Sequence, residues 1–194
     1  MQFKNAEKFI LEKLGTELPA KLFYHSIEHI KDVFAAAGMI GREEKITDQE
    51  MQLLLTAALF HDSGFLREPK DHEEESCRIA RQFLPDFDYT SEEIDQICGM
   101  IMATKIPQSP KNHLEEILAD ADLDYLGRDD FFEIGDKLFQ ELSIFGFLNF
   151  EDDWNRLQVR FIESHHYFTK TAIRLRQAKK ETHLALVTAK LDHI

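Results

Sequence analysis

Residues 46–64 read ITDQEMQLLLTAALFHDSG, and this stretch decides the fold. Thr47 and Glu50 stand near its start with the spacing of a capping box, which opens a helix. Gly64 marks its end. Between these signals the residues are apolar nearly all round, which is typical of a helix buried in the middle of a domain. The sequence therefore predicts a central helix whose last residues are a histidine and an aspartate.

Apolar residues recur at helical spacing on both sides of this segment, so we expect consecutive helices along the whole chain. Asp71 is expected to cap the helix that follows, and Thr90 with Glu93 forms a second capping box. No stretch alternates with period two for long enough to form a sheet, and no repeat or low-complexity linker divides the chain. The fold class is therefore predicted to be all-α, as a single-domain helical bundle over residues 1–194. The expected helices cover residues 2–14, 20–38, 46–64, 72–84, 90–104, 112–125, 130–142, 152–166 and 169–191.

Charge restricts the partners that this protein can have. The 194 residues include 23 Lys and Arg against 36 Asp and Glu, which gives a net charge of −13. So acidic a surface disfavours nucleic acid and anionic membranes as partners. The longest apolar run, residues 53–60, is far too short to span a bilayer. A small phosphorylated ligand remains compatible with this charge, because a local cation can outweigh the overall field.

The cysteines and the first residues indicate the compartment. Cys77 and Cys98 are the only cysteines and do not form a CxxC motif, so a disulfide scaffold is excluded and a reducing compartment fits. The first residues are interrupted by charges and lack the apolar core of a signal peptide. We expect a cytoplasmic protein.

Three groups of polar residues could carry chemistry, and the first is YHSIEH at residues 24–29. His25 and His29 are four residues apart, so on a helix they would share one face. Such a pair can bind one metal together, or one histidine can bind metal while the other meets the substrate. A chain with nine histidines also produces such pairs by chance.

The second group is the pair His61-Asp62 at the end of the central helix. Neighbours on a regular helix point about 100° apart, so both can face one site only where the helix ends. A metal would satisfy both side chains, which are costly to bury unpaired. Alternatively, Asp62 caps the next turn and His61 is hydrogen-bonded in the core.

The third group is ADADLDYL at residues 119–126, where Asp120, Asp122 and Asp124 alternate within an apolar helical pattern. Asp is unfavourable inside helices, so three of them need a reason. One of them could point inward toward a cation, or all three could face water.

The order H…HD…D on helices resembles the HD-domain superfamily of metal-dependent phosphohydrolases, in particular its small stand-alone bacterial members. YHSIEH is similar to the YHNxxH stretch of several branches, including the cyclic-nucleotide phosphodiesterases. FHDSG resembles the HDxG motif, DHEEESCRIA the helix that follows it, and LADADLDYLG the final helix with its metal-binding Asp. The similar motifs lie within residues 20–126, and residues 127–194 form a helical C-terminal extension. The resemblance implies a helical bundle of the HD-domain type.

Carried over residue by residue, the resemblance implies one divalent cation, with Mn, Fe, Co, Ni, Mg or Zn as candidates. His25 then falls where a general acid protonates the leaving group in the phosphodiesterase branch, and Ser26 replaces the Asn that is common there. His72 matches the first extra ligand of members with two metals, whereas Lys105 follows the place where the next histidine would be expected. The implied metal ligands are His29, His61, Asp62 and Asp122.

The implied reaction is hydrolysis by a metal-activated water, because a bound metal lowers the pKa of water from ~15.7 toward ~7. Asp120 or Glu73 could accept the proton of the water, and His25 could donate one to the leaving oxygen. Arg67, Lys70 and Lys105 are candidate phosphate contacts, although loop cations are commonly just solvated. The leading hypothesis is a phosphomonoesterase or phosphodiesterase that acts on a small nucleotide-like molecule.

Other hypotheses remain open. The protein could be an HD-fold nucleotide-binding regulatory module with little or no turnover, or, with weaker support, a mixed-valent di-iron oxygenase. The Phe-rich residues 131–150 could form core, a lid over the pocket or a homodimer surface. Trp154 and the pair at 165–166 have no assigned role.

Overall fold

Helix α3 (Asp48–Phe60) forms the centre of the main hydrophobic core, as the 46–64 stretch predicts. The Thr47 hydroxyl accepts the Glu50 N–H, and the Glu50 carboxylate accepts the Thr47 N–H, so the expected capping box is present. The helix ends at Phe60, and the 3₁₀ helix η1 (Ser63–Leu66) follows. His61 and Asp62 therefore lie in the short turn between two helices.

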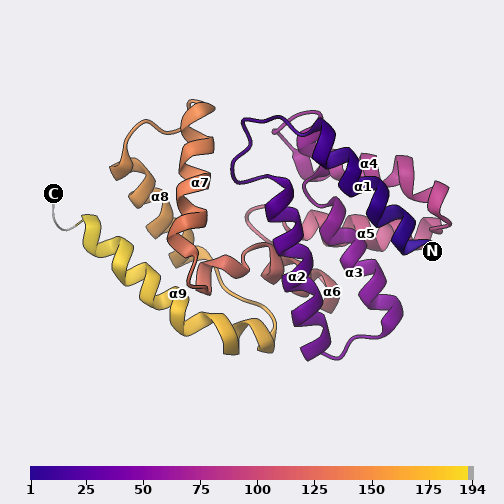
Figure 1. Ribbon diagram of the computed structural model, residues 1–194. Coiled ribbons are helices and arrows are strands. Elements are labelled where there is room, and N and C mark those ends of the chain that lie inside the picture. Colours follow the sequence, from indigo (N-terminus) through magenta and orange to yellow (C-terminus); the bar gives the residue numbers. More distant parts are fainter. Residues whose placement is uncertain (192–194) are drawn as a thin grey trace.

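The computed structural model describes residues 1–191, and the described residues form helices and connecting segments with no strand (Figure 1). This confirms the all-α prediction. None of the described helices reaches the length and hydrophobicity that crossing a bilayer would require. The remaining elements are α1 (Phe3–Glu17), α2 (Ile27–Glu43), α4 (His72–Phe83), η2 (Leu84–Phe87), α5 (Ser91–Ala103), α6 (His113–Asp122), η3 (Asp124–Gly127), α7 (Phe131–Ile144), α8 (Glu151–Ser164) and α9 (Lys170–Leu191).

Two hydrophobic clusters divide the interior. The larger one is built from α1 to α6, which pack around α3. The smaller one joins Tyr24 and η3 to α7, α8 and α9, which lie together on the other side of the molecule in Figure 1. Buried apolar side chains of both clusters supply the main stabilisation of the fold. The boundary between the clusters passes beside the ends of α3 and α6.

A buried ion pair joins η3 to α9 within the smaller cluster. Asp124 is almost fully buried and accepts hydrogen bonds from Arg176 on α9, at 2.7 and 3.1 Å. Gly127 also lies close to Arg176, because a Cβ added at Gly127 would be 2.4 Å from the Arg176 carbonyl oxygen. Because Asp124 is buried, the expectation that all three acids of residues 119–126 could face water is wrong.

Local boundaries differ from the predicted ones at α2 and α4. Helix α2 begins at Ile27 and not near residue 20, because Ser26 caps it by accepting the backbone N–H of His29. His25 consequently precedes the helix, and the prediction that it shares a helix face with His29 is wrong. Asp71 has a left-handed backbone and makes no side-chain cap for α4, unlike the prediction.

Candidate metal centre and adjoining cavity

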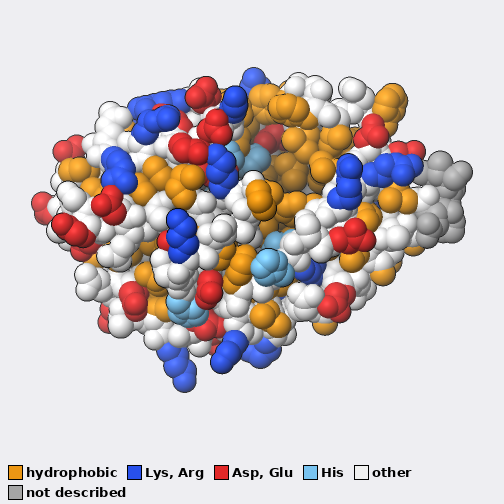
Figure 2. Space-filling view, turned by 180° about the vertical axis from the view of Figure 1, so that it is seen from behind, with side chains coloured by type: hydrophobic (Ala, Val, Ile, Leu, Met, Phe, Trp, Pro, Cys, Tyr) orange, Lys and Arg blue, Asp and Glu red, His pale blue; other side chains and the backbone are white. Residues whose placement is uncertain are grey.

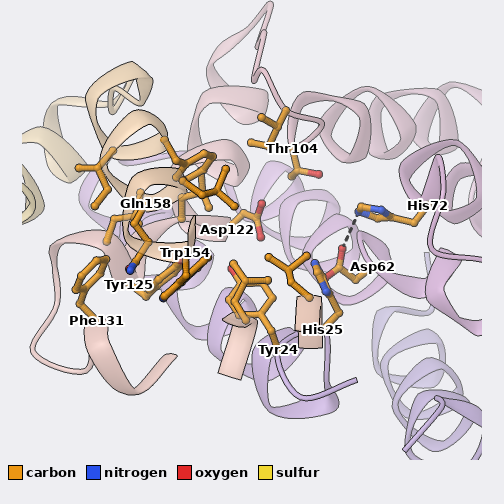
Figure 3. A pocket seen from close by; sticks show the side chains of 18 of the residues that line it. Tyr24, His25, Asp62, His72, Thr104, Asp122, Tyr125, Phe131, Trp154 and Gln158 are labelled. Atoms are coloured by element: carbon orange, nitrogen blue, oxygen red, sulfur yellow. Dashed lines mark ion pairs between the residues drawn. The ribbon is translucent and has the colours of Figure 1, made fainter. Parts of the chain in front are cut away.

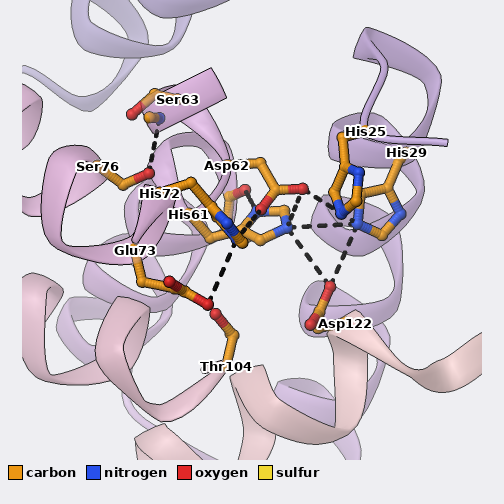
Figure 4. A network of polar contacts seen from close by, with 12 residues as sticks. His25, His29, His61, Asp62, Ser63, His72, Glu73, Ser76, Thr104 and Asp122 are labelled. Atoms are coloured by element: carbon orange, nitrogen blue, oxygen red, sulfur yellow. Dashed lines mark hydrogen bonds and ion pairs between the residues drawn. The ribbon is translucent and has the colours of Figure 1, made fainter. Parts of the chain in front are cut away.

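Four side chains from three helices converge at the boundary between the two hydrophobic clusters (Figure 4). His29 comes from the first turn of α2, and Asp122 is the last residue of α6. His61 and Asp62 come from the turn after α3, where the end of the helix lets adjacent residues face one point. These are the four residues named as ligands from the sequence, and the fold brings them together.

The distances within this cluster suit a single ion. The Nε2 atoms of His29 and His61 are 3.4 Å apart. Asp122 Oδ1 lies 3.2 Å from the first and 3.5 Å from the second. Asp62 Oδ2 lies 3.5 and 3.2 Å from the same two atoms. Ligands bound at about 2.0–2.2 Å from one cation lie roughly 2.8–3.6 Å apart, so the contacts of each carboxylate with the two histidines fit a coordination sphere. The ligand atoms of His29, His61 and Asp122 all lie within 4.8 Å of one another, and Asp62 reaches both histidines.

Two further observations support the fit of a cation. His61 Nδ1 donates to the Ala58 carbonyl at 2.8 Å, which leaves the lone pair of Nε2 directed at the cluster. Asp62 Oδ2 is buried, yet no described residue gives it a well-formed hydrogen bond. A buried carboxylate oxygen without a donor is costly, and a cation would remove that cost.

The electrostatics of the cluster favour positive charge. Burial alone raises the pKa of Asp122, but hydrogen bonds from His29 and His61 outweigh burial and hold this pKa at about 2. Burial lowers the pKa of His61, but the negative charge of Asp62 and the bond to Asp122 raise it well above its ordinary value. The field that stabilises a proton at this point also stabilises a metal cation.

His25 lies beside this cluster and is held by a residue that the sequence did not reveal. The Glu141 carboxylate accepts the Nδ1 proton of His25 and the backbone N–H groups of Tyr24 and His25, at 2.8 and 3.1 Å for the last two. Glu141 is 2% exposed. It shares the apolar stripe of α7 with Ile134 and Leu138, and an acid on such a stripe is the signal that could have identified it.

His72 and Glu73 lie at the start of α4, next to Asp62. His72 faces Oδ1 of Asp62, whereas Oδ2 of Asp62 faces His29 and His61. His72 Nε2 is 3.4 Å from Asp62 Oδ1 and 3.5 Å from Glu73 Oε1, and its Nδ1 donates to the Pro69 carbonyl. Gly64 permits this approach, because an added Cβ there would lie 2.0 Å from the His72 carbonyl oxygen. The structure thus places both predicted residues next to the cluster.

Asp120 and two of the predicted phosphate contacts are engaged elsewhere. Asp120 accepts the backbone N–H groups of Phe168 and Thr169 and the Thr169 hydroxyl, so it holds the start of α9. Arg67 donates to Glu75 and Gln82.

Lys105 pairs with Glu74 and Asp71, on the outer side of α4. Lys70 is exposed in the loop before α4. The structure does not bring Asp120, Arg67, Lys70 or Lys105 to the cavity described next, because none of them is among its lining residues.

A cavity of about 210 Å³ opens beside the cluster. Asp62, Asp122 and His72 lie toward one end of it, and aromatic side chains of η3, α7 and α8 toward the other (Figure 3). Figure 2 shows the face of the molecule with an apolar hollow beside histidine side chains. Trp154, which carried no role in the sequence, and the buried Gln158 both line the cavity.

Comparison with known proteins gives one family and several similar structures. The HD domain model matches residues 26–124. No curated protein matches the chain. A predicted HD superfamily hydrolase from an uncultured Thermotogales bacterium is 20% identical, with a TM-score of 0.64, over 98% of this chain and 91% of the other.

Two further solved structures have the same fold. Bacillus subtilis YpgQ, solved in complex with ADP, is 21% identical with a TM-score of 0.64, over 97% of each chain. A Lactobacillus plantarum protein is 15% identical with a TM-score of 0.68, over 100% of this chain and 98% of the other. At these identities the likeness concerns the fold.

Proposed function

Because the chain belongs to the HD domain family, we propose that it is a metal-dependent phosphohydrolase that cleaves the phosphoester of a small molecule. The observation that carries the proposal is the convergence of four side chains beside an open cavity, where the carboxylates of Asp62 and Asp122 each lie 3.2–3.5 Å from the Nε2 atoms of both His29 and His61. A cluster of this kind at a cavity wall is where a hydrolytic metal site is expected.

The donor set agrees with a hydrolytic metal. Two imidazole nitrogens and two carboxylates suit Mn, Fe, Co, Ni or Zn, and Mg is the remaining candidate. When bound, such an ion supplies a water of lowered pKa and polarises the phosphoryl group. His61 is oriented for this task by its bond to Ala58, which fixes the nitrogen that faces the cluster.

Two residues next to the cluster are suited to move protons. Glu73 is buried and lines the cavity, and among residues 1–191 its one contact with a basic side chain is that with His72. We therefore assign it as the base that accepts a proton from the attacking water. His25 lines the same cavity, and its Nδ1 is held by Glu141. Its Nε2 is therefore the atom that donates a proton to the leaving oxygen.

His72 remains the proposed ligand of a second cation. Its Nε2 faces Asp62 Oδ1 and Glu73 Oε1, which are both carboxylate oxygens. Thr104 lines the cavity nearby, whereas the Lys105 ammonium group points to Glu74 and Asp71. A second ion would thus rest on His72 and carboxylates alone.

YpgQ was solved with ADP, so ADP is the probe with which the nucleotide-like substrate expected from the sequence is tested. The same probe tests the alternative, a nucleotide-binding module without turnover. Binding of ADP without phosphate release across several metals would select the module. The site geometry favours the hydrolase, because Glu73 and His25 accompany the four ligands.

The test combines metal content with turnover. The purified protein is analysed for bound metals by mass spectrometry and assayed for phosphate release from several phosphoesters in the presence of each candidate metal. Asp122→Asn keeps the shape of the ligand and removes its charge, and we expect it to lose metal and at least 100-fold of the activity. The control Asp86→Asn changes an exposed aspartate in η2. Equal metal content and activity in both variants would refute the proposal.

A further inference from the structure

We propose that the substrate carries a single phosphoryl group on an apolar alcohol or phenol of about one ring in size, and that the site discriminates against nucleoside di- and triphosphates. This inference rests on the proposed phosphohydrolase function and specifies its substrate class. It is drawn from the polarity, the charge and the size of the cavity next to the cluster.

The cavity has a polar and an apolar end. Asp62 and Asp122 lie at the polar end, where the reacting phosphoryl group would bind. The opposite wall is formed by side chains that are almost all apolar, from η3, α7 and α8 (Figure 3). An organic group on the phosphate oxygen would have to extend into this wall, and burial of apolar surface there favours a hydrophobic group by about 25 cal/mol per Å². The apolar wall includes Leu126, Phe131, Leu138, Leu142, Trp154 and Ile162.

The charges that line the cavity oppose additional phosphates. None of the described lining residues is Lys or Arg, and the acids among them are Asp62, Glu73 and Asp122. Arg67 and Lys105, two of the cations predicted as phosphate contacts, do not line the cavity. Arg67 forms an ion pair with Glu75 of α4, and Lys105 forms ion pairs with Asp71 and with Glu74 of α4. One phosphoryl group can be neutralised at the cluster, but a second or third would meet carboxylates and apolar walls, which is costly.

The size of the cavity agrees with a small organic group. An apolar cavity of about 150 Å³ in another protein holds one benzene molecule. The cavity here is about 210 Å³, which gives room for one ring or a short alkyl chain. Gln158 is the buried amide in the wall and could bind one uncharged polar atom on that group.

Trp154 provides a direct readout of binding. It is the only tryptophan of the chain and lines the cavity, so its fluorescence reports on occupancy without turnover. The metal-loaded protein is titrated with hexyl phosphate, inorganic phosphate and ADP. We expect hexyl phosphate to bind at least 10-fold more tightly than either of the others. ADP binding that is equal or tighter, or no binding of hexyl phosphate, would overturn the inference.

A variant at the mouth of the cavity sharpens the comparison. Leu157 lines the cavity and is 36% exposed, so Lys is tolerated there without loss of the core. Leu157→Lys should weaken the binding of hexyl phosphate at least fivefold and strengthen the binding of ADP, because it adds a cation to a cavity lined by no Lys or Arg of the described residues. Leu186→Lys, at a 49% exposed position of α9 outside the cavity, is the matched control. An unchanged hexyl phosphate to ADP ratio in Leu157→Lys would count against the inference.

Turnover separates this inference from the function on which it rests. Hydrolysis of ADP together with tighter ADP binding upholds the phosphohydrolase and overturns the substrate class. Preferential binding of hexyl phosphate without release of phosphate, for all candidate metals, upholds the preference of the cavity and refutes the hydrolase.

Discussion

The Glu141 carboxylate accepts the Nδ1 proton of His25, although the two residues are 116 positions apart in the chain. One oxygen of the same carboxylate also accepts two backbone N–H groups of the segment that carries His25. Burial raises the pKa of Glu141, but the bond from His25, the charge of His25 and the two backbone N–H groups together outweigh burial and lower it, so the carboxylate is charged. A charged acceptor at Nδ1 fixes the orientation of the His25 ring and leaves Nε2 as the nitrogen available for proton transfer.

This relationship predicts a specific kinetic defect. Glu141→Gln retains the shape but loses the charge, so we expect kcat to fall about 10- to 100-fold, which is at or below the roughly 10²–10⁴-fold contribution of general acid catalysis because His25 itself remains. The defect should shrink for p-nitrophenyl phosphate relative to phenyl phosphate, because a good leaving group needs no proton. This dependence on the leaving group is the readout that a purely structural role of Glu141 would not change. Glu133→Gln, at an exposed position of the same helix, should leave kcat and its dependence on the leaving group unchanged.

The ligand cluster predicts stabilisation by metal. Metal that binds only the folded state at 100 times its Kd adds about 2.7 kcal/mol. For a domain of this size that corresponds to a rise in Tm of roughly 5–10 °C. We expect this rise when Mn²⁺ is added to protein treated with a chelator, measured by thermal unfolding. Asp62→Asn should reduce it strongly, and an equal rise in this variant would argue against Asp62 as a ligand.

Because folding keeps His165 in its neutral form, we expect the protein to lose stability in mild acid. Burial and the nearby Lys180 lower the pKa of His165 to about 3. The unfolded chain takes up a proton near pH 6.5 while the folded chain does not, so stability is full above pH 6.5 and falls as the pH decreases toward 3. At pH 5.5 the loss from this residue is at most about 1.4 kcal/mol.

The variant His165→Gln isolates this effect. Urea unfolding at pH 7.5 and 5.5 should show a smaller decrease for His165→Gln than for the natural chain, because Gln does not titrate. His166→Gln, at the exposed neighbouring position, is the control. Identical pH dependence in the natural chain and His165→Gln would disprove the assignment.

A single methyl group added at Gly64 is expected to lower the stability of the fold strongly. A Cβ there would lie 2.0 Å from the His72 carbonyl oxygen, and backbone cannot move away cheaply. Gly64→Ala should therefore destabilise the protein by about 3 kcal/mol or more, at the upper end of single substitutions. Gly15→Ala is the comparison, because its Cβ would meet Ile27 Cδ1 at an ordinary 3.5 Å. Similar midpoints for the two variants in urea would contradict the close approach.

Local signals in the sequence are sufficient to predict most of the helices. The capping boxes at Thr47 and Thr90 both form, because such boxes depend on residues three apart and not on the rest of the fold. The start of α2 was misplaced because apolar spacing continues through residues 20–26, whereas the backbone there is fixed by the Ser26 cap and by Glu141 from a distant helix.

The candidate site was predictable where one motif supplies each ligand. His29, His61, Asp62 and Asp122 could be named from the resemblance, but their convergence depends on the packing of α2, α3 and α6. The partner of Asp120 lies 49 residues away, at Thr169, and no local pattern shows that this acid is used to hold α9. Glu141 was missed for the same physical reason.

The two hydrophobic clusters carry different parts of the proposed site, the metal ligands in one case and the wall that would contact the organic group of the substrate in the other. The proposed ion ligands lie on or directly after helices packed in the first cluster, whereas α7 and α8 contribute most of the apolar wall. New specificities can therefore be engineered by exchanging side chains within residues 131–164 while the ligands stay untouched. Such redesign has one fixed point, Glu141, because it is the side chain of that region that holds His25.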